Sequence, residues 1–561
     1  MQEGSAHLGR RRWATLVILT LSTFIVTLDS AVVFIALPAI LQDLGGTLDE
    51  ATWVIAAFVL SFAVFLLPFG KLADIYGRRL LFMSGIVVFA LASLGCALAP
   101  SMEFLIGARV VQGIGAAMVE PTVLAIIKAT FPSERLGLAF GVQGIAAVLG
   151  AAFGPILGGI ITTALSWEYI FLLNVPVGVV AVAGALLVVP ESRAEGVSRR
   201  LDLPGLLFSG TGVFFLVFAI VEGERFGWGS VTILGSFAAA AVLLALFIIT
   251  ELRVRVPLVD LTLFKDRLFA VGNVLRGVVE FATLGLFFPL ALFLQIQLGH
   301  SPLDTGLLLL PLIVASFFTS PLAGALSDRV DVRLIVVPGF VVVAVGIFWV
   351  AHLSPETGWK FFIAPLAIAG AGLGALEAPT VSATLRNVPT AQSGIASSVS
   401  YTTFLIGLEL GVAVVGAVLQ NQLVANVKDA LSGANLPPGV AEEISSSLSE
   451  GGVSGQPAAQ ISGPGAARIQ GLIEGAFAAA VNTALFSCVA VALLGAVVAL
   501  FFSSNRKVGV EFSASLTPPI GNANDGEVSY TLVEGVSIRR SQDSDLRRSF
   551  PVWTQRTHPE T

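Results

Sequence analysis

Long apolar runs separated by short polar loops dominate this chain. A helix rises about 1.5 Å per residue and the hydrocarbon core of a bilayer is about 30 Å thick, so an apolar run of about 20 residues predicts a membrane-crossing helix. Fourteen such runs occur, at 14–37, 52–70, 80–99, 104–127, 137–163, 168–189, 203–222, 231–250, 269–297, 306–325, 333–352, 361–383, 393–421 and 477–502. The pattern therefore predicts an all-α integral membrane protein with fourteen transmembrane helices.

Composition agrees with this pattern. Hydrophobic residues make up 55% of the 561 residues, charged residues make up 12%, and the mean hydropathy is +0.89. Most of the chain is therefore expected to have the lipid bilayer as its solvent. The net charge of −6 belongs to loops and a polar tail and predicts no nucleic-acid partner. Cys96 and Cys488 both fall in apolar runs, and their spacing predicts neither a disulfide framework nor a metal site.

The distribution of Lys and Arg gives an expected orientation. If the N-terminus is cytoplasmic, the outer loops hold only four of the 31 basic residues, namely Arg225, Lys360, Lys428 and Arg468. The other loops and the two ends of the chain hold nearly all the rest, as expected for cytoplasmic segments. An odd number of spans would break this alternation. We therefore expect a multi-pass protein of the cell membrane with both termini in the cytoplasm.

Three sequence elements recur in the same order. Residues 70–74 are echoed by 324–328, 120–122 by 377–380, and the glycines of the fifth span by those of the thirteenth, at offsets of 254 to 258 residues. The repeat pairs the first six spans with the last six and leaves two extra helices inserted between them. Two parallel six-helix halves that handle substrate near the midplane are an architecture of secondary transporters.

The expected organisation follows from the repeat. It comprises a cytoplasmic N-terminus (1–13), an N-terminal half (14–189), a linker with two extra helices (190–268), a C-terminal half (269–502) with an external loop at 422–476, and a tail (503–561). The loop is expected to carry a short helix near 440–448. The tail is polar and is expected to be cytoplasmic and without fixed structure.

Residues 70–79 read GKLADIYGRR and resemble the signature loop between the second and third spans of the major facilitator superfamily. Gly70 and Gly77 permit a tight turn, and Asp74 can face a helix dipole or an arginine partner on the other half. This resemblance implies a gate that holds the cytoplasmic side shut in the outward-open state. Its expected residues are Gly70, Asp74, Gly77, Arg78 and Arg79, with Asp328 and Arg329 in the echo, where Asp331 replaces the second glycine.

Residues 150–159 read GAAFGPILGG and look like the antiporter motif of export members of that superfamily. Gly150, Gly154 and Gly158 lie four residues apart on one face of the fifth span, beside Pro155 and Gly159. Small residues allow close helix approach, and a proline bends a helix. The motif indicates a close, bendable contact that suits a rocking interface. Ordinary small-residue helix contact is the alternative interpretation.

Two further stretches extend the resemblance, which covers about residues 10–505. Residues 109–115 (RVVQGIG) resemble the fourth-span motif of proton-coupled members, and residues 28–38 (LDSAVVFIALP) resemble the first-span motif of the fourteen-span drug:proton antiporters. The family resemblance implies a proton-coupled antiporter of the multidrug, antibiotic-resistance type. It implies alternating access, a monomer and no cofactor.

Seven ionisable residues lie well inside predicted spans: Asp29, Arg109, Glu120, Arg276, Glu280, Glu377 and Glu409. Each costs at least about 2.5 to 3.5 kcal/mol at the bilayer centre and is by default a functional candidate. Five acids face two bases, so acids remain without evident permanent partners. A lipid-buried carboxyl can carry a proton and release it when a cation arrives, which is what an antiporter needs.

Among these candidates, Asp29 and Glu409 are the best placed for proton coupling, since both lie in or beside family-like motifs. Hydrogen bonding to a neighbouring helix is the alternative for both. Arg276 and Glu280, four residues apart, can simply pair with each other. Glu120 and Glu377 precede prolines and can instead cap disrupted backbone. Arg109 is expected to tune or relay the proton.

The favoured function is efflux of small amphipathic, cationic drugs or toxic compounds in exchange for protons. A dedicated exporter of an endogenous metabolite, such as a siderophore, antibiotic or lipid, is the first alternative. A non-transporting receptor or scaffold that works through its tail is the second. Neither a metal nor an enzyme activity is expected, since the sequence carries no catalytic triad, phosphate-binding glycine loop or metal-ligand cluster.

Overall fold

The computed structural model describes residues 2–193, 201–432 and 466–502, and every regular element in these ranges is helical. Fourteen of the described helical segments are long and apolar enough to cross a membrane, which confirms the predicted count. The short helix expected near 440–448 and the tail at 503–561 lie outside the described residues.

The first half begins with a long helix that continues past its predicted end at 37. Its helices are α1 (Gln2–Leu44), α2 (Leu48–Tyr76), α3 (Arg78–Ala97), α4 (Met102–Thr130), α5 (Leu136–Ala164), α6 (Glu168–Leu172) and α7 (Asn174–Val188). The sixth predicted span is broken at Leu173 into α6 and α7. The inserted helices are α8 (Leu203–Val221), the short α9 (Gly223–Phe226) and α10 (Val231–Glu251).

The second half repeats the order of the first. It consists of α11 (Arg267–Leu292), α12 (Pro302–Ser327), α13 (Arg333–Val350), α14 (Lys360–Arg386), α15 (Ser393–Ser432) and α17 (Ala466–Ala499). The predicted loop at 422–476 is thus helical at both of its ends, and its middle lies outside the described residues. Hydropathy finds only the part of a helix that is apolar enough for lipid, whereas backbone hydrogen bonds continue beyond it.

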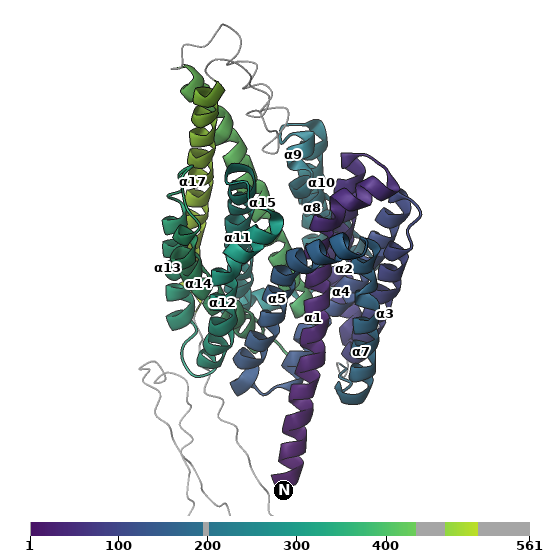
Figure 1. Cartoon of the computed structure of the whole chain (residues 1–561). Coiled ribbons are helices and arrows are strands. Elements are labelled where there is room, and N and C mark those ends of the chain that lie inside the picture. Colours follow the sequence, from purple (N-terminus) through teal and green to yellow (C-terminus); the bar gives the residue numbers. More distant parts are fainter. Residues whose placement is uncertain (1, 194–200, 433–465, 503–561) are drawn as a thin grey trace, which may run out of the picture. The chain divides into compact units, whose positions relative to one another are not determined.

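Two large hydrophobic cores correspond to the two groups of helices in Figure 1. One core is built from α11 to α17 and includes Phe340 and Leu419. The other is built mainly from α1 to α8, yet it also takes in Tyr401 and Leu405 of α15. The beginning of α15 therefore packs into the first half and joins the two.

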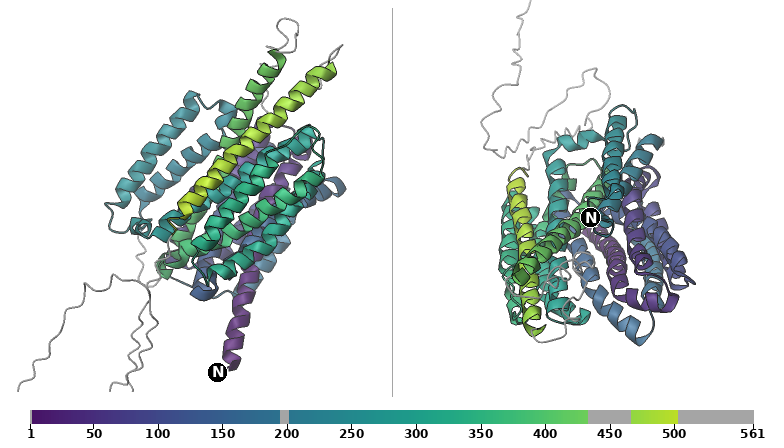
Figure 2. Two further views of the ribbon diagram at one scale, coloured as in Figure 1. Left: turned by 90° about the vertical axis from the view of Figure 1, so that its left-hand side faces the viewer. Right: turned by 90° about the horizontal axis from the view of Figure 1, so that it is seen from above.

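The inserted helices form a hairpin beside the bundle, visible in the left view of Figure 2. Helix α10 packs chiefly against α8, and α8 in turn contacts α2 and α15. Most of α10 is exposed in the absence of lipid, which suits a helix that faces the bilayer.

Candidate functional site

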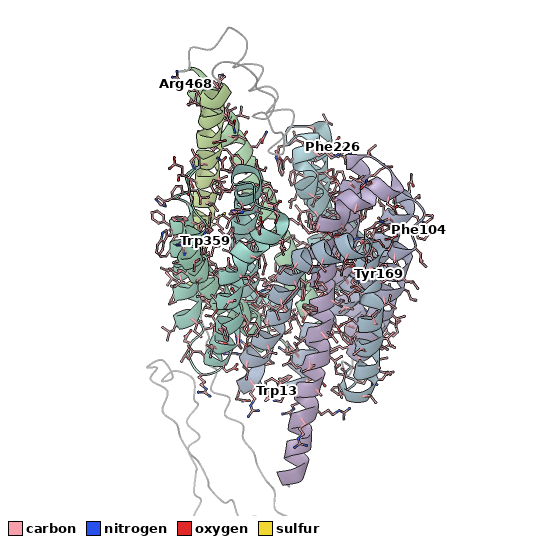
Figure 3. The ribbon with its side chains drawn as sticks, in the orientation of Figure 1. Trp13, Phe104, Tyr169, Phe226, Trp359 and Arg468 are labelled. Carbon is pink, nitrogen blue, oxygen red and sulfur yellow. The ribbon has the colours of Figure 1, made fainter. Side chains whose placement is uncertain are left out.

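One end of the bundle carries most of the basic residues, including Lys71, Arg78 and Lys128, and is called the basic end below. Trp13 lies toward this end, whereas Phe226 and Arg468 lie at the opposite end (Figure 3). Lys128 of α4 donates a hydrogen bond to the Leu385 carbonyl oxygen at the end of α14. The two halves therefore touch at the basic end.

Asp74 makes the most extensive of these contacts. Its two carboxylate oxygens accept the backbone N–H groups of Gly394 at 2.9 Å and Ile395 at 3.0 Å, in the first turn of α15. Arg78 pairs with Asp74 at 2.9 Å and donates to the Thr390 carbonyl oxygen. An acid at a helix N-terminus satisfies donors that have no partner within the helix. Asp74 thus caps a helix of the other half.

Asp328 makes the equivalent contact in the second half. Its oxygens accept the N–H groups of Gly137 at 2.8 Å and Leu138 at 3.2 Å, in the first turn of α5. Burial raises the pKa of the Asp328 carboxyl above its ordinary value, and the two N–H donors counter only part of that rise. The repeated element that begins at residue 324 therefore has the same helix-capping geometry as residues 70–79, even though Asp331 stands in place of its second glycine.

Glycines allow the backbones to meet at both mirrored contacts. A Cβ atom on Gly70 would lie 1.9 Å from the Ser398 hydroxyl, and one on Gly137 would lie 2.1 Å from the Gly324 carbonyl oxygen. Gly77 has φ of 115°, a conformation that favours glycine, at the turn between α2 and α3. Arg79 donates to the Leu186 carbonyl oxygen within the first half, and Arg329 is exposed.

The antiporter-like glycines lie within the first half, not between the halves. Cβ atoms on Gly150, Gly154 and Gly158 would all come within 3 Å of α1, whereas Gly159 has open space around it. The side chain of Pro155 is outside the described residues. The close approach expected from this motif therefore joins α5 to α1, and α5 meets α12 of the other half through Gly137 and other residues near the basic end.

A polar cluster lies between the two halves, deeper in the bundle. Glu120 of α4 is 3% exposed, and one carboxylate oxygen accepts hydrogen bonds from Tyr401 of α15 and from Thr23 of α1, the latter at 3.4 Å. Gln143 of α5 donates to the Thr23 hydroxyl at 3.3 Å. The second oxygen, Glu120 Oε1, is buried and has no hydrogen-bond partner among the described residues. Glu120 does not cap backbone here, in contrast to the alternative interpretation.

The second half contributes the rest of the cluster. Arg276 of α11 forms an ion pair with Glu280 at 3.4 Å and a second one with Glu377 of α14. Its guanidinium also lies 4.7 Å from the centre of the Phe404 ring, which in turn lies 5.6 Å from Tyr401. Two carboxyl groups thus share one guanidinium while Glu120 binds only hydroxyl groups, so the cluster has more acid than base.

The internal repeat organises this cluster. Glu120 and Glu377 are 257 residues apart, as are Thr23 and Glu280. The same offset relates Tyr401 to Gly144, and a Cβ atom on Gly144 would lie 3.3 Å from Glu377. Glu120 and Glu377 are therefore equivalent acids, each facing the other half.

Asp29 and Arg109 occupy a separate network inside the first half. They pair at 2.6 Å, and Asp29 also accepts hydrogen bonds from Gln112 at 2.9 Å and Asn174 at 2.6 Å. Both charged residues are 1% exposed, and Arg109 also donates to the Val54 carbonyl oxygen. Every carboxylate oxygen of Asp29 has a partner, so this acid is held as a structural ion pair.

Glu409 lies on α15, two turns beyond the Tyr401 contact, and is half-buried. No hydrogen bond or ion pair joins it to any residue in the described ranges. The sequence-derived candidates thus fall into three places: the cluster between the halves, the Asp29 network, and Glu409 alone.

Comparison with known proteins identifies the family to which this chain belongs. The profile described as "Major Facilitator Superfamily" matches residues 19–412. The chain belongs to the major facilitator superfamily. It is 31% identical to the tetracenomycin C resistance and export protein of Streptomyces glaucescens, over 88% of this chain and 91% of that protein. It is 35% identical to the multidrug resistance protein Stp of Mycobacterium tuberculosis strain CDC 1551, over 75% and 78% respectively.

The fold of this superfamily member also matches a solved structure. The human organic anion transporter MFSD10 superposes with a TM-score of 0.55 at 14% identity, covering 87% of this chain and 99% of that one. At this identity the match concerns the fold alone. The family and the matched relatives are membrane transporters, which makes this superfamily member a transporter and not an enzyme.

Several partners in the site were not among the sequence candidates. Tyr401 and Thr23 bind Glu120, Gln143 binds Thr23, and Gln112 and Asn174 complete the Asp29 network. For Tyr401 the repeat offset was the available signal, because it pairs this residue with a glycine beside Glu377. Gln112 belongs to the RVVQGIG stretch at 109–115 and lies three residues after Arg109, which was a signal for it. For Asn174 no signal was available, since it meets Asp29 only in the folded bundle.

Proposed function

We propose that this transporter exports small amphipathic, cationic compounds in exchange for protons by alternating access. Two six-helix halves at 14–189 and 269–502 would rock against each other, with the substrate near the midplane. The basic end is the cytoplasmic end in this proposal, because basic residues gather on the cytoplasmic side of membrane proteins. The protein acts as a monomer in the cell membrane, with both termini in the cytoplasm.

Export rather than uptake is supported by the relatives. One is named a resistance and export protein for tetracenomycin C and the other a multidrug resistance protein. Both names describe resistance, and the first also describes export. A dedicated exporter of an endogenous antibiotic is the second candidate, and the name of the tetracenomycin C relative is the observation that favours it.

The contacts between halves describe a conformation closed at the basic end. Asp74 caps α15 and Asp328 caps α5, and both acids lie on the opposite half from the helix that they cap. These contacts must break before a compound can enter from the cytoplasm. The cytoplasmic end is therefore closed in this conformation, in the proposed orientation.

The observation that carries proton coupling is the environment of Glu120. Its buried oxygen Oε1 has no partner among the described residues, and its other oxygen binds Tyr401 across the two halves. A buried carboxylate with an unsatisfied oxygen is costly, and one proton removes the charge, which is the larger part of that cost. Glu120 is thus placed where a proton can change the contact between the halves.

Substrate charge follows from the balance of the cluster. Glu280 and Glu377 share the single cation Arg276, and Glu120 has only hydroxyl partners, so the acids between the halves outnumber the base and protons or a cationic substrate can neutralise the excess. The rings of Phe404 and Tyr401 offer aromatic faces to such a cation. A cation arriving from the cytoplasm would displace protons, and protons arriving from outside would displace the cation.

Proteoliposomes with an imposed pH gradient test this function. Wild-type protein should drive a fluorescent lipophilic cation against its gradient, and a protonophore should abolish that movement. Glu120→Gln should lose gradient-driven transport, whereas Glu103→Gln, at an exposed acid on α4, should not. Full gradient-driven transport by Glu120→Gln would reject Glu120 as the coupling acid. Glu409→Gln in the same assay asks whether that isolated acid also takes part.

A further inference from the structure

The foot of the inserted hairpin holds two buried acids that the transport cycle above does not use. Asp202 immediately precedes α8 and is 6% exposed, and Glu251 ends α10 and is 5% exposed. One oxygen of Asp202 accepts the Gly205 N–H at 3.1 Å, and one oxygen of Glu251 accepts the Val259 N–H at 3.2 Å. Each carboxyl therefore has one oxygen committed to backbone.

The two remaining oxygens lie close together without partners. Asp202 Oδ2 and Glu251 Oε1 are both buried and have no hydrogen-bond partner among the described residues. A Cβ atom on Gly205 would lie 2.3 Å from the first oxygen and 2.7 Å from the second, so the two oxygens are at most about 5.0 Å apart. Only glycine leaves room for them here.

Two like charges at this separation, shielded from water, repel each other strongly. A single proton changes this balance, because it neutralises one of the two carboxyl groups and removes the repulsion between them. The other charged groups that face the pair are few. Lys71 of α2 attracts Glu251, but its ammonium group is bound to the Pro257 carbonyl oxygen at 2.9 Å.

The segment that follows α10, residues 257–260, connects this pair to both halves and is called the strap. Val259 binds Glu251, Pro257 binds Lys71 of the first half, and Asp260 accepts a hydrogen bond from Gln392 of the second half at 3.2 Å. Leu258 and Val259 are buried in the core of the first half. Displacement of Glu251 would therefore remove one of the strap's three hydrogen bonds and loosen it at Val259.

We propose that Asp202 and Glu251 form a proton-binding site that holds one shared proton and fastens the strap between the two halves. Loss of this proton leaves two facing carboxylates, and their repulsion moves Glu251 away from the Val259 N–H. The site is separate from the Glu120 cluster and senses the pH on the side of the membrane where α10 ends. This inference does not depend on the identity of the exported compound.

Infrared difference spectroscopy of the purified full chain tests the proton directly. A pH jump on wild-type protein should reveal a carboxylic acid C=O band that shifts in D₂O and disappears as the pH rises. The Glu120→Gln variant, which removes the other acid proposed to exchange a proton, should retain a band of this kind, as should the exposed-site control Glu103→Gln. Addition of Glu251→Gln or Asp202→Asn to Glu120→Gln should abolish that band. An unchanged band in Glu120→Gln/Glu251→Gln would overturn the proposal.

Hydrogen exchange at the Val259 amide tests the link to the strap. After correction for intrinsic exchange chemistry, protection in wild-type protein should fall by about tenfold as the pair loses its proton. Glu251→Gln keeps an oxygen for Val259 and supplies an N–H to Asp202, so its protection should be high and independent of pH. Glu251→Ala should lose protection at every pH. The same pH dependence in wild type and Glu251→Gln would contradict the link.

Discussion

Removal of the Asp74 carboxylate should open the basic end much more than removal of its mirror, Asp328. Asp74 is 2% exposed at the side chain and pairs with Arg78, which is 0% exposed. Asp74→Ala therefore leaves the fully buried Arg78 guanidinium without its ion-pair partner and also removes the cap of α15. Asp328→Ala also uncaps a helix, α5. Asp328 forms no ion pair within hydrogen-bonding distance among the described residues, so this variant leaves no buried charge without its partner.

The magnitudes follow from this difference. Loss of an acidic cap costs about 0.5 to 2 kcal/mol, so Asp328→Ala should shift the equilibrium between closed and open basic ends by about fivefold. Removal of one partner from a buried ion pair costs about 3 to 5 kcal/mol, so Asp74→Ala should shift it by about a hundredfold or more. The double variant Asp74→Ala/Arg78→Met removes both charges and should recover most of the difference.

Pulsed electron paramagnetic resonance can measure the two populations. Spin labels at the exposed positions Tyr76 and Pro389 report the separation of the halves at the basic end, after replacement of the two native cysteines. A second, longer distance should appear strongly in Asp74→Ala and weakly in Asp328→Ala. Equal shifts in the two variants would refute the argument from Arg78, and an unrescued double variant would refute it independently.

Three further outcomes are expected. Tyr401→Phe keeps the aromatic contacts but removes a hydrogen bond to Glu120 worth about 1.5 to 3 kcal/mol, so transport rate should fall at least about tenfold while KM for the cation changes little. Asp29→Asn leaves Arg109 buried without its counter-ion, so the variant should have lower thermal stability and yield than wild type. The fraction that folds should still couple transport to protons. A stable variant that has lost proton coupling would contradict this. The pKa of Asp328 is raised, so its contribution to stability is present at acid pH and is lost as the pH rises through that raised value. Asp328→Asn cannot ionise, so the difference between its melting temperature and that of wild type should grow in favour of the variant as the pH rises. A difference that falls with rising pH would contradict this argument.

The membrane architecture could be predicted from the sequence because lipid imposes a length and a polarity on every span. The fourteen apolar runs and the repeat at offsets of 254 to 258 residues led directly to two six-helix halves and an inserted pair. The repeat also predicted that Asp328 would echo Asp74, although not that each acid caps a helix of the opposite half.

The different environments of the acids could not be predicted in the same way. Asp29 and Glu120 look alike in sequence, as single acids in apolar helices. Asp29 is neutralised by side chains from α4 and α7, and Glu120 is left with an unsatisfied oxygen between the halves. Such partners come from distant segments, and helical spacing within one span carries no information about them.

Proton release on substrate binding tests the central proposal most directly. A lipophilic cation added to purified wild-type protein in weakly buffered detergent solution should release protons, because cation and proton compete for the acids between the halves. Glu120→Gln should bind the cation and release at least one proton fewer, whereas Glu103→Gln should match wild type. Undiminished proton release from Glu120→Gln, with the cation still bound, would contradict the proposal that Glu120 carries the exchanged proton.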